Sequence, residues 1–241
     1  PCEITSYLYK QAADLVISKD NNDIERKFWK DDFSVDSSEN CTLISGSLPT
    51  WDISNKKMTF STSGQFCYGF QLPSNDNFVG EMFFKPQTVS SMSDRCGILA
   101  YKDDNNFAYI NIGYNSTTSR TYKFIKTGGV VILNDFAAHT GTYHESNPAK
   151  VTIVNTNGTI VIKGYYPQSG GGFVTTSNDQ ISLAISDGYR IGLVNGVTLN
   201  PVDVIAFGIR PSISYSDDFT SDTVSGANGR YQAVTGTVAY D

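Results

Sequence analysis

The residues with the clearest chemical potential are tyrosines gathered in the middle of the chain. A tyrosine ring has a flat apolar face and a hydroxyl, so an exposed ring stacks on the CH groups of a sugar or packs at a protein interface. The alternative is that a given ring fills the hydrophobic core. The candidates for glycan or protein binding are Tyr101, Tyr109, Tyr114, Tyr122, Tyr165 and Tyr166.

A second candidate is the run formed by Asp103, Asp104 and Asn105. Carboxylate and amide oxygens are the ligands that Ca²⁺ prefers, so this run can contribute to a calcium site. Asp and Asn are also the residues that a tight turn between two strands requires. Both interpretations stay open, and no cofactor other than calcium is expected.

The composition of the chain excludes several classes of protein. Charged residues make up only 17% of the 241 residues, and there are 14 Tyr and 14 Phe, which is unlike a disordered chain. The formal net charge of −6 disfavours nucleic acid as a partner, and no apolar run is long enough for membrane insertion. The acidic residues are 19 Asp and only five Glu, and Asp favours turns. We therefore expect many strands joined by turns.

The alternation of apolar and polar residues has a period of two from residue 31 onward, which predicts strands. The clearest turn is Asn157-Gly158, which lies between two β-branched runs and is typical of a type I′ hairpin. The predicted strands cover residues 41–48, 57–61, 66–72, 78–85, 96–101, 107–114, 120–126, 130–133, 150–155, 159–164, 181–185, 189–194 and 203–210. A series of strands without helices between them predicts a sandwich or barrel.

The first 30 residues follow a different pattern. Leu8, Ala12 and Leu15 lie at helical spacing, and a capping-box sequence opens a second stretch. We expect two short helices, at about 5–17 and 23–30. Since isolated helices of this length are marginal in water, they would form an N-terminal arm that packs on the domain or on a neighbouring protein.

A motif near the start of the strand-rich region recurs near the end of the chain. Asp31-Asp32-Phe33-Ser34 is followed 186 residues later by Asp217-Asp218-Phe219-Thr220. The recurrence predicts one β-sandwich over 31–213, after the helical arm over 1–30, and a segment over 214–241 that begins a second tandem copy. Alternatively, this segment gives a strand to a neighbouring subunit, because an incomplete domain exposes strand edges.

Four cysteines allow three pairings, and no Cys-x-x-Cys is present. Cys67 and Cys96 fall within predicted strands, where a free cysteine is often a small buried apolar residue. Disulfides and free thiols both stay open for Cys2, Cys41, Cys67 and Cys96.

The predicted sandwich unit has a series of motifs in a recognisable order. They are the opening Asp-Asp-Phe, Gly46 and Trp51, the strand 78–84, the strand 96–101 with its turn at 103–106, and the closing segments 188–193 and 203–209. This series resembles the concanavalin A-like, laminin-G-like family of jelly-roll domains. The resemblance implies an all-β sandwich of two antiparallel sheets. Members of the family bind glycans or proteins, some hold calcium at the rim, and some hydrolyse polysaccharides.

Catalytic relatives usually carry two carboxylates in a Glu-x-Asp-x-x-Glu string on one strand, because glycoside hydrolysis needs such a pair. No such string is present, and we expect Glu81 to be an outward-facing strand residue. His139 and His144 are expected to be ordinary loop residues. We therefore expect no catalytic residues. An Asp recruited from a loop would still permit a polysaccharide-cleaving enzyme.

The sequence leads to one main functional hypothesis and two alternatives. We expect a non-catalytic structural or adhesion module of a surface assembly, such as a phage or viral tail, fibre or capsid component, or an extracellular adhesin. Its expected partners are glycans or neighbouring subunits of a homo- or hetero-oligomeric assembly, and its expected location is the virion surface or the cell exterior. The alternatives are a polysaccharide-cleaving hydrolase or lyase and a secreted calcium-dependent protein-binding domain.

Overall fold

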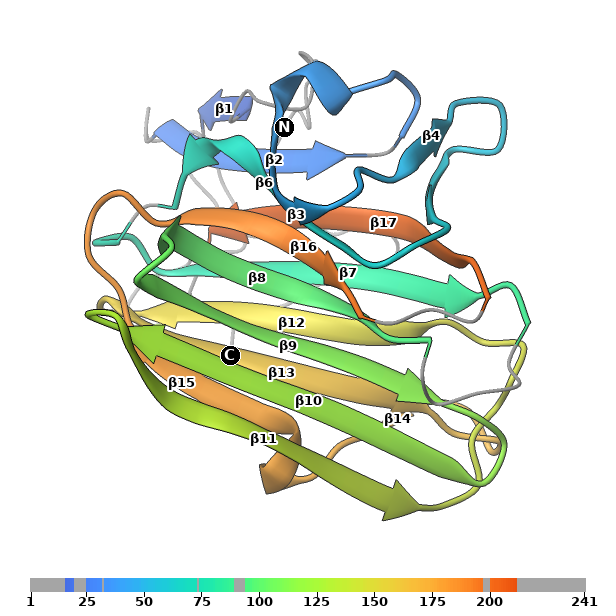
Figure 1. Cartoon of the computed structure of the whole chain (residues 1–241). Helices are drawn as coiled ribbons and strands as arrows, with labels where there is room; N and C mark the ends of the chain where they lie inside the picture. The colour runs from blue at the N-terminus through green and yellow to red at the C-terminus, as the bar shows by residue number, and fades with distance from the viewer. Residues whose placement is uncertain are drawn as a thin grey trace, which may run out of the picture.

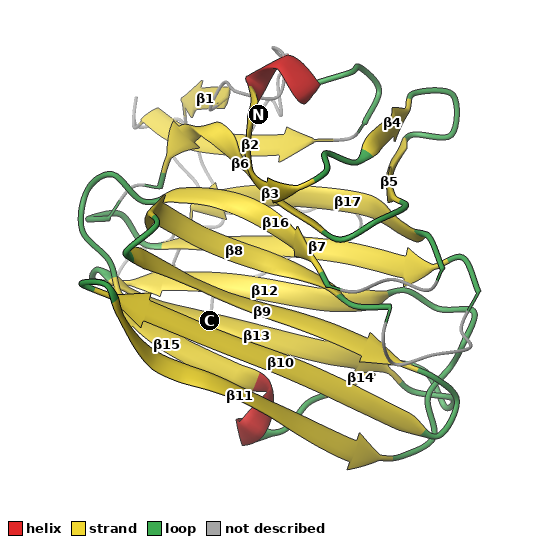
Figure 2. Cartoon of the chain, viewed as in Figure 1, coloured by secondary structure: helices red, strands yellow, loops and turns green. Residues whose placement is uncertain are grey.

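The computed structural model of the chain describes residues 16–19, 25–31, 33–72, 74–88, 94–196 and 200–211. These residues form two antiparallel sheets packed as two layers, with two short 3-10 turns, η1 (Ser38–Asn40) and η2 (Ser177–Asp179) (Figures 1 and 2). The expected all-β, two-sheet sandwich is therefore confirmed. No helix among the described residues is long and apolar enough to cross a membrane.

The larger sheet has ten strands. Its main path runs through β1 (Val16–Lys19), β2 (Glu25–Asp31), β17 (Val202–Pro211), β7 (Phe78–Pro86), β12 (Ala149–Thr156), β13 (Thr159–Pro167) and β14 (Phe173–Val174). β15 (Gln180–Ala184) also pairs with β13, while β5 (Lys57–Phe60) pairs with β17 and with β4 (Thr50–Asp52). The first and last described strands thus lie in one sheet.

The smaller sheet has seven strands and lies across the other face of the core (Figure 1). Its order is β11 (Val130–Thr140), β10 (Thr118–Thr127), β9 (Asn106–Tyr114), β8 (Cys96–Asp103), β16 (Arg190–Asn195), β6 (Gly64–Gln71) and β3 (Cys41–Gly46). Every predicted strand is present in one of the two sheets. β11 is longer than predicted, so His139 lies in a strand and its expected place in a loop is wrong.

The predicted helix over 23–30 is wrong where the structure describes it. Residues Glu25–Asp31 form β2, which pairs with β17 and extends the sheet to the N-terminal side of residue 31. The strand is favoured because a short isolated helix is only marginally stable in water, whereas the backbone of β17 offers groups with which this segment pairs. Most of the other predicted helix, and the whole of 214–241, lie outside the described residues, although residues 16 and 17 begin β1.

Strand alternation builds the core between the two sheets. The inward positions hold large apolar side chains that are almost fully buried, and the partly buried Trp51 packs against them. The largest are Tyr68, Tyr114, Tyr166, Phe33, Phe60, Phe66, Phe78, Phe84, Phe207, Met58 and Leu72. The predicted hairpin at Asn157-Gly158 is confirmed, since both residues have positive φ angles, 51° and 79°.

The Asp-Asp-Phe motif has a structural role in its first copy. The Asp31 carboxylate is buried and accepts hydrogen bonds from the Phe33 N–H (2.9 Å) and the Ser37 hydroxyl (2.8 Å). The Tyr68 hydroxyl donates to the same carboxylate at 3.3 Å, and Phe33 is fully buried with a φ of 56°. The motif therefore fixes the sharp bend by which the chain leaves β2 and enters the core.

Three of the four cysteines lie within the described residues, and all three are free thiols. Cys67 and Cys96 are fully buried, as expected for small apolar strand residues. Burial raises the pKa of both thiols, so they stay protonated and unreactive at neutral pH.

Asp203 connects β17 to β5 through its carboxylate. Lys57 Nζ donates to it at 2.8 Å and Thr59 Oγ1 at 2.7 Å, and the Gln87 amide donates at 3.0 Å. Burial by itself raises the pKa, but these three donors outweigh burial and hold the pKa of Asp203 below its ordinary value of 3.8. A lowered pKa stabilises the fold above the unfolded-state pKa, and this contribution is lost as the pH falls through the folded-state pKa.

We expect Asp203→Asn to lower the free energy of unfolding by about 1 kcal/mol at neutral pH, because it removes charge-assisted hydrogen bonds that are partly exposed. The difference from the wild type should be smaller at an acidic pH below the folded-state pKa of Asp203, where the carboxyl group is protonated in both the folded and the unfolded protein. Urea unfolding at the two pH values measures this. An equal difference at both would show that the carboxylate charge does not contribute.

Candidate functional site

The outer face of the seven-stranded sheet carries the residues of the candidate site. On β9, Ala108, Ile110 and Ile112 are fully buried and point into the core. The alternating residues Phe107 and Tyr109 therefore point to the outer face, and both are half-buried there. The same alternation applies to β8 and β10, which flank β9 (Figure 1).

Six aromatic side chains from β8, β9, β10 and β11 lie together on this face, and we call them the aromatic row. They form three directly opposed cross-strand pairs, which are Tyr101 with Phe107, Tyr109 with Phe124, and Tyr122 with Phe136. The ring centroids in these pairs are 6.1, 5.4 and 6.1 Å apart, and Phe107 stacks on Phe124 at 5.1 Å. Cross-strand aromatic pairs hold one another in place, so the row presents preformed flat surfaces.

Four cations lie over the rings of the aromatic row. The Arg95 guanidinium is 4.6 Å from the centroid of the Tyr122 ring, and the Arg120 guanidinium is 5.8 Å from that of Phe136. Arg190 lies 5.8 Å from Tyr101, at the other end of the row, and Lys126 Nζ lies 6.0 Å from Phe107. These distances are within the range of cation–π attraction. The row is therefore a mixed aromatic and cationic surface.

Several polar atoms at one end of the row lack hydrogen-bond partners. Asn111 faces Tyr122 across β9 and β10, and its side chain is 3% exposed. Its Oδ1 atom, Arg95 Nε and Arg120 Nε are buried and make no hydrogen bond with any residue that the structure describes. An unpaired buried polar group costs free energy, so it would be favourable for a ligand or water to donate to Asn111 Oδ1 and to accept from the Nε–H groups of Arg95 and Arg120.

The six predicted tyrosines divide into three groups. Tyr101, Tyr109 and Tyr122 lie in the aromatic row, whereas Tyr165 lies on the outer face of the ten-stranded sheet, beside Lys150. Tyr114 and Tyr166 are 0% and 1% exposed, so the prediction that they face a ligand is corrected. Both occupy inward positions of their strands, and both hydroxyls are bonded inside the protein, to Asn147 O and Thr121 Oγ1.

Sequence reasoning missed the phenylalanines and arginines of the site. The available signal was the spacing of two residues along β10, where Arg120, Tyr122, Phe124 and Lys126 alternate with inward residues. An antiparallel strand with one solvated face normally carries polar side chains on that face, so the two outward aromatic residues, Tyr122 and Phe124, are the unusual feature. That pattern distinguishes this face from an ordinary solvent-exposed sheet.

No protein-family model and no curated protein matches the chain. Among solved structures, the VIP36 exoplasmic/lumenal domain in its Ca²⁺/Man2-bound form is 11% identical, with a TM-score of 0.52 over 78% of this chain and 88% of that one. A xylan β-1,4-xylosidase from Bacillus halodurans C-125 is 14% identical, with a TM-score of 0.52 over 75% and 38%. The Bacteroides ovatus xyloglucan PUL GH43B protein is 13% identical, with a TM-score of 0.50 over 76% and 39%.

The similarity to these solved structures and the two-sheet topology indicate the same fold. The fold is a concanavalin A-like jelly roll. At identities of 11–14% the likeness concerns the fold alone. The jelly roll spans about two fifths of the length of the Bacteroides and Bacillus proteins, so it corresponds to one part of each of them.

The predicted calcium run forms the hairpin turn between β8 and β9 of the jelly roll. The Asp103 carboxylate accepts hydrogen bonds from the Asn105 N–H (2.8 Å) and the Asn106 amide (2.9 Å), and Asp104 accepts one from the Tyr101 hydroxyl at 2.8 Å. Burial, followed by the bond to Asp104, raises the pKa of Tyr101 to about 12, which keeps the ring neutral. Within the described ranges, no three His, Cys, Asp or Glu side chains gather as metal ligands.

We expect millimolar calcium chloride to leave the thermal midpoint of the protein unchanged, because the Asp103 oxygens already receive donors from the turn itself. A bound ion stabilises a fold in proportion to the logarithm of its concentration relative to its dissociation constant. Differential scanning fluorimetry with calcium, and with magnesium as the ionic-strength control, measures the effect. A midpoint that rises with calcium alone would establish a calcium site.

Tyr165 belongs to a second, smaller cluster on the outer face of the ten-stranded sheet of the jelly roll. Lys150 Nζ lies 4.9 Å from its ring centroid and 5.2 Å from that of Phe173. The same Lys150 pairs with the Glu81 carboxylate at 3.4 Å, so its charge is compensated. Glu81 lies at an outward position, as predicted, and serves as a salt-bridge partner there.

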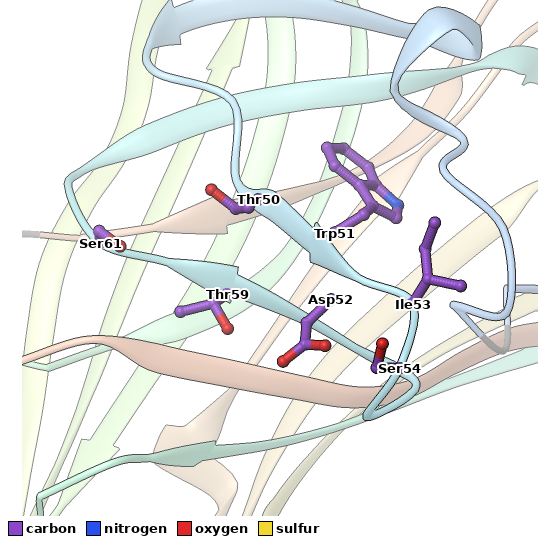
Figure 3. Close-up of a pocket in the computed structure, with 7 residues that line it drawn as sticks. All are labelled: Thr50, Trp51, Asp52, Ile53, Ser54, Thr59 and Ser61. Carbon is purple, nitrogen blue, oxygen red and sulfur yellow. The ribbon is translucent and has the colours of Figure 1, made fainter.

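An open hollow at the edge of the jelly roll is a weaker candidate. It is lined by residues of β4, β5 and the turn between them, namely Thr50, Trp51, Asp52, Ile53, Ser54, Thr59 and Ser61 (Figure 3). Trp51 and Asp52 point to opposite sides of β4, and the Asp52 carboxylate is bonded to Asn55 within its own turn. The hollow brings together neither stacked rings nor a cation, in contrast to the aromatic row.

The two histidines have separate local roles. His139 Nε2 lies 3.0 Å from the Asp179 carboxylate, which is fully buried and also accepts from the Thr121 hydroxyl at 2.6 Å. His144 Nδ1 accepts a hydrogen bond from the Ser146 N–H in its turn. His139 therefore connects β11 to the η2 turn rather than joining the aromatic row.

Proposed function

We propose that this jelly roll is a non-catalytic carbohydrate-binding module whose ligand lies along the aromatic row. The observation that carries the proposal is the set of three cross-strand aromatic pairs on an outer sheet face. Flat, half-exposed rings stack on the CH-bearing faces of sugar rings, while neighbouring polar groups bond to hydroxyls. The VIP36 domain, which shares the fold, is known in a Man2-bound form, which supports this class of ligand.

The aromatic row would bind a glycan rather than cleave it. Glycoside hydrolysis needs two carboxylates that flank the bond to be broken. On β9, β10 and β16, and on β8 as far as Tyr101, the described outward positions hold aromatic, amide, hydroxyl, cationic, aliphatic and glycine residues. The carboxylates of Asp103 and Asp104 lie in the turn at the Tyr101 end of the row, where they accept hydrogen bonds from Asn105 and Tyr101. Glu81 lies on the opposite sheet and is paired with Lys150. These features support a binding module over a hydrolase or lyase.

The direct test is a glycan array probed with the full chain, followed by calorimetry on the bound glycans. We expect binding to a defined group of glycans and no release of reducing sugar from the same compounds. Absence of binding to every glycan at high micromolar protein would contradict the proposal. Release of reducing ends would replace it with the polysaccharide-cleaving alternative.

The cellular setting is part of the same proposal. A chain rich in Asn, Ser and Thr, with a fold shared by lumenal and polysaccharide-related proteins, supports a module of an extracellular or surface assembly. We propose a viral or phage tail, fibre or capsid component, or an adhesin, with neighbouring subunits as the second class of partner. Electron microscopy of the source particle or cell surface with an antibody against the chain tests this setting.

A further inference from the structure

The charge distribution on the aromatic row contrasts with that of the whole protein. The chain has a formal net charge of −6. The outward positions of β9, β10 and β16, and those of β8 as far as Tyr101, nevertheless include no carboxylate among the described residues, while Arg120, Lys126 and Arg190 lie there. Asp103 and Asp104 lie in the turn at the Tyr101 end of the row, away from Arg95 and Arg120. Arg95, just before β8, adds a fourth positive charge over Tyr122. An acidic protein therefore presents a local cationic surface at the site.

None of these four cations is neutralised by an ion pair with a residue that the structure describes. The salt bridges in the described part of the chain join Lys57 to Asp203, Lys123 to Asp135 and Lys150 to Glu81, and His139 Nε2 lies beside the Asp179 carboxylate. Arg95 and Arg120 take part in none of them. A partly desolvated guanidinium without a carboxylate partner is costly, and an anionic ligand would remove that cost.

Arg95 and Arg120 both lie at the end of the row that Tyr122 and Phe136 form. Burial, and to a smaller extent the nearby Arg120 charge, lower the pKa of Arg95 from its usual value, although an arginine remains protonated at neutral pH. Such a pair of like charges is unfavourable in the free protein. The planar guanidinium fork matches a carboxylate or sulfate, and both Nε atoms lack an acceptor in the described structure.

Asn111 sets a second requirement for the ligand, which is a hydrogen-bond donor. Asn111 is more than nine-tenths buried, and it lies on the outer face of the sheet between Gly97 and Tyr122. Its Oδ1 atom accepts no hydrogen bond from any residue that the structure describes. A buried amide oxygen needs a donor, and a sugar hydroxyl is one. The site thus requires a ligand with both a hydrogen-bond donor and an anionic group beside a stackable ring.

We propose that the glycan bound on the aromatic row is anionic, with its carboxylate or sulfate received by Arg95 and Arg120 and a hydroxyl donated to Asn111. This inference rests on the proposed function and specifies its ligand class. A neutral glycan would leave the two guanidinium groups without an acceptor of matching charge. The rings on the Tyr101 side of the row would bind the adjoining sugars of the same chain by stacking.

The test uses the full chain on an array in which every acidic glycan stands beside its neutral counterpart. Uronic-acid and sialylated glycans are paired with carboxyl-reduced forms, and sulfated glycans with desulfated forms. We expect the acidic member of the bound pairs to bind about tenfold or more tightly, with affinity that falls as salt is raised. If the preference is seen in the carboxylate pairs, the bound anionic group is a carboxylate, and if it is seen in the sulfate pairs, the group is a sulfate.

The variants Arg95→Gln and Arg120→Gln should each remove this preference while the residual binding of the neutral member persists. Arg210→Gln, on β17 of the opposite sheet, is the matched control and should leave the preference unchanged, and thermal melts establish that each variant is folded. Arg120→Lys should restore part of the preference, because it keeps the charge and loses the fork.

The outcomes separate this inference from the proposed function. Equal affinity for acidic and neutral members of bound pairs would overturn the anionic ligand and leave carbohydrate binding intact. No binding to any member would overturn both. Binding to glycoproteins that survives removal of their glycans would assign the row to a protein partner, and would also overturn the inference.

Discussion

Tyr109→Ala is expected to weaken glycan binding by about tenfold to a hundredfold without unfolding the protein. Tyr109 lies at the centre of the aromatic row, where its ring stacks against Phe124 at 5.4 Å and beside Phe107 at 6.5 Å. A buried aromatic anchor at the centre of a binding surface contributes about 1–3 kcal/mol, and each 1.4 kcal/mol is a factor of ten in affinity. Calorimetric titration with the tightest-binding glycan measures the loss.

The matched control for this prediction is Tyr165→Ala. Tyr165 is also half-buried on an outer sheet face and also lies beneath a cation, Lys150, but on the opposite sheet. This variant should bind like the wild type. If Tyr165→Ala lost affinity and Tyr109→Ala kept it, the ligand would belong to the ten-stranded sheet, and the aromatic row would be only a structural feature. Tyr109→Phe should keep most of the affinity, since the ring is retained.

Asp179→Ala, away from the aromatic row, is expected to cause a large loss of stability. The Asp179 side chain is fully buried and accepts hydrogen bonds from Thr121 Oγ1 (2.6 Å), the Thr176 N–H (2.7 Å) and the Thr176 hydroxyl (2.9 Å). His139 contacts the same carboxylate. Removing the acceptor leaves these donors unpaired in the interior, at a cost of about 3–5 kcal/mol.

Thermal and urea unfolding measure this loss, and for a chain of this size it corresponds to a fall of roughly 6–20 °C in the midpoint. Asp135→Ala is the control, because Asp135 also pairs with a cation, Lys123, but lies on the surface. That variant should leave the midpoint nearly unchanged. A similar midpoint for the two variants would show that the buried network around Asp179 contributes little.

The strand pattern was predictable because it depends on local chemistry. Turn residues such as Asn157-Gly158 require positive φ angles, and β-branched runs on either side favour extended backbone, so these elements could be located from neighbouring residues alone. Strand β2 could not be located from neighbouring residues. Its partner, β17, begins at Val202, and only that distant edge makes the extended form of residues 25–31 preferable to the helix that local spacing suggests.

The site was only partly predictable, because the two faces of its central strands look alike in sequence. On β9, the inward Ile110 and Ile112 alternate with Tyr109 and Asn111, so apolar or aromatic residues occupy both faces. Period-two alternation then fails to say which tyrosines point outward. Tyr114 continues the inward positions of β9 and was wrongly expected on the surface, while the arginines, which no motif marks, were overlooked.

The sequence by itself determined that the chain forms many short strands joined by Asp- and Asn-rich turns, that it has a two-sheet jelly roll, and that tyrosines are its main binding candidates. The tertiary structure decided which of those tyrosines face outward and which arginines and phenylalanines accompany them. The physical reason is register. The pairing of β8, β9, β10 and β11 places side chains as far apart in the sequence as Thr118 and Thr140 directly opposite one another. No local pattern encodes that alignment, because it depends on how both sheets share one core.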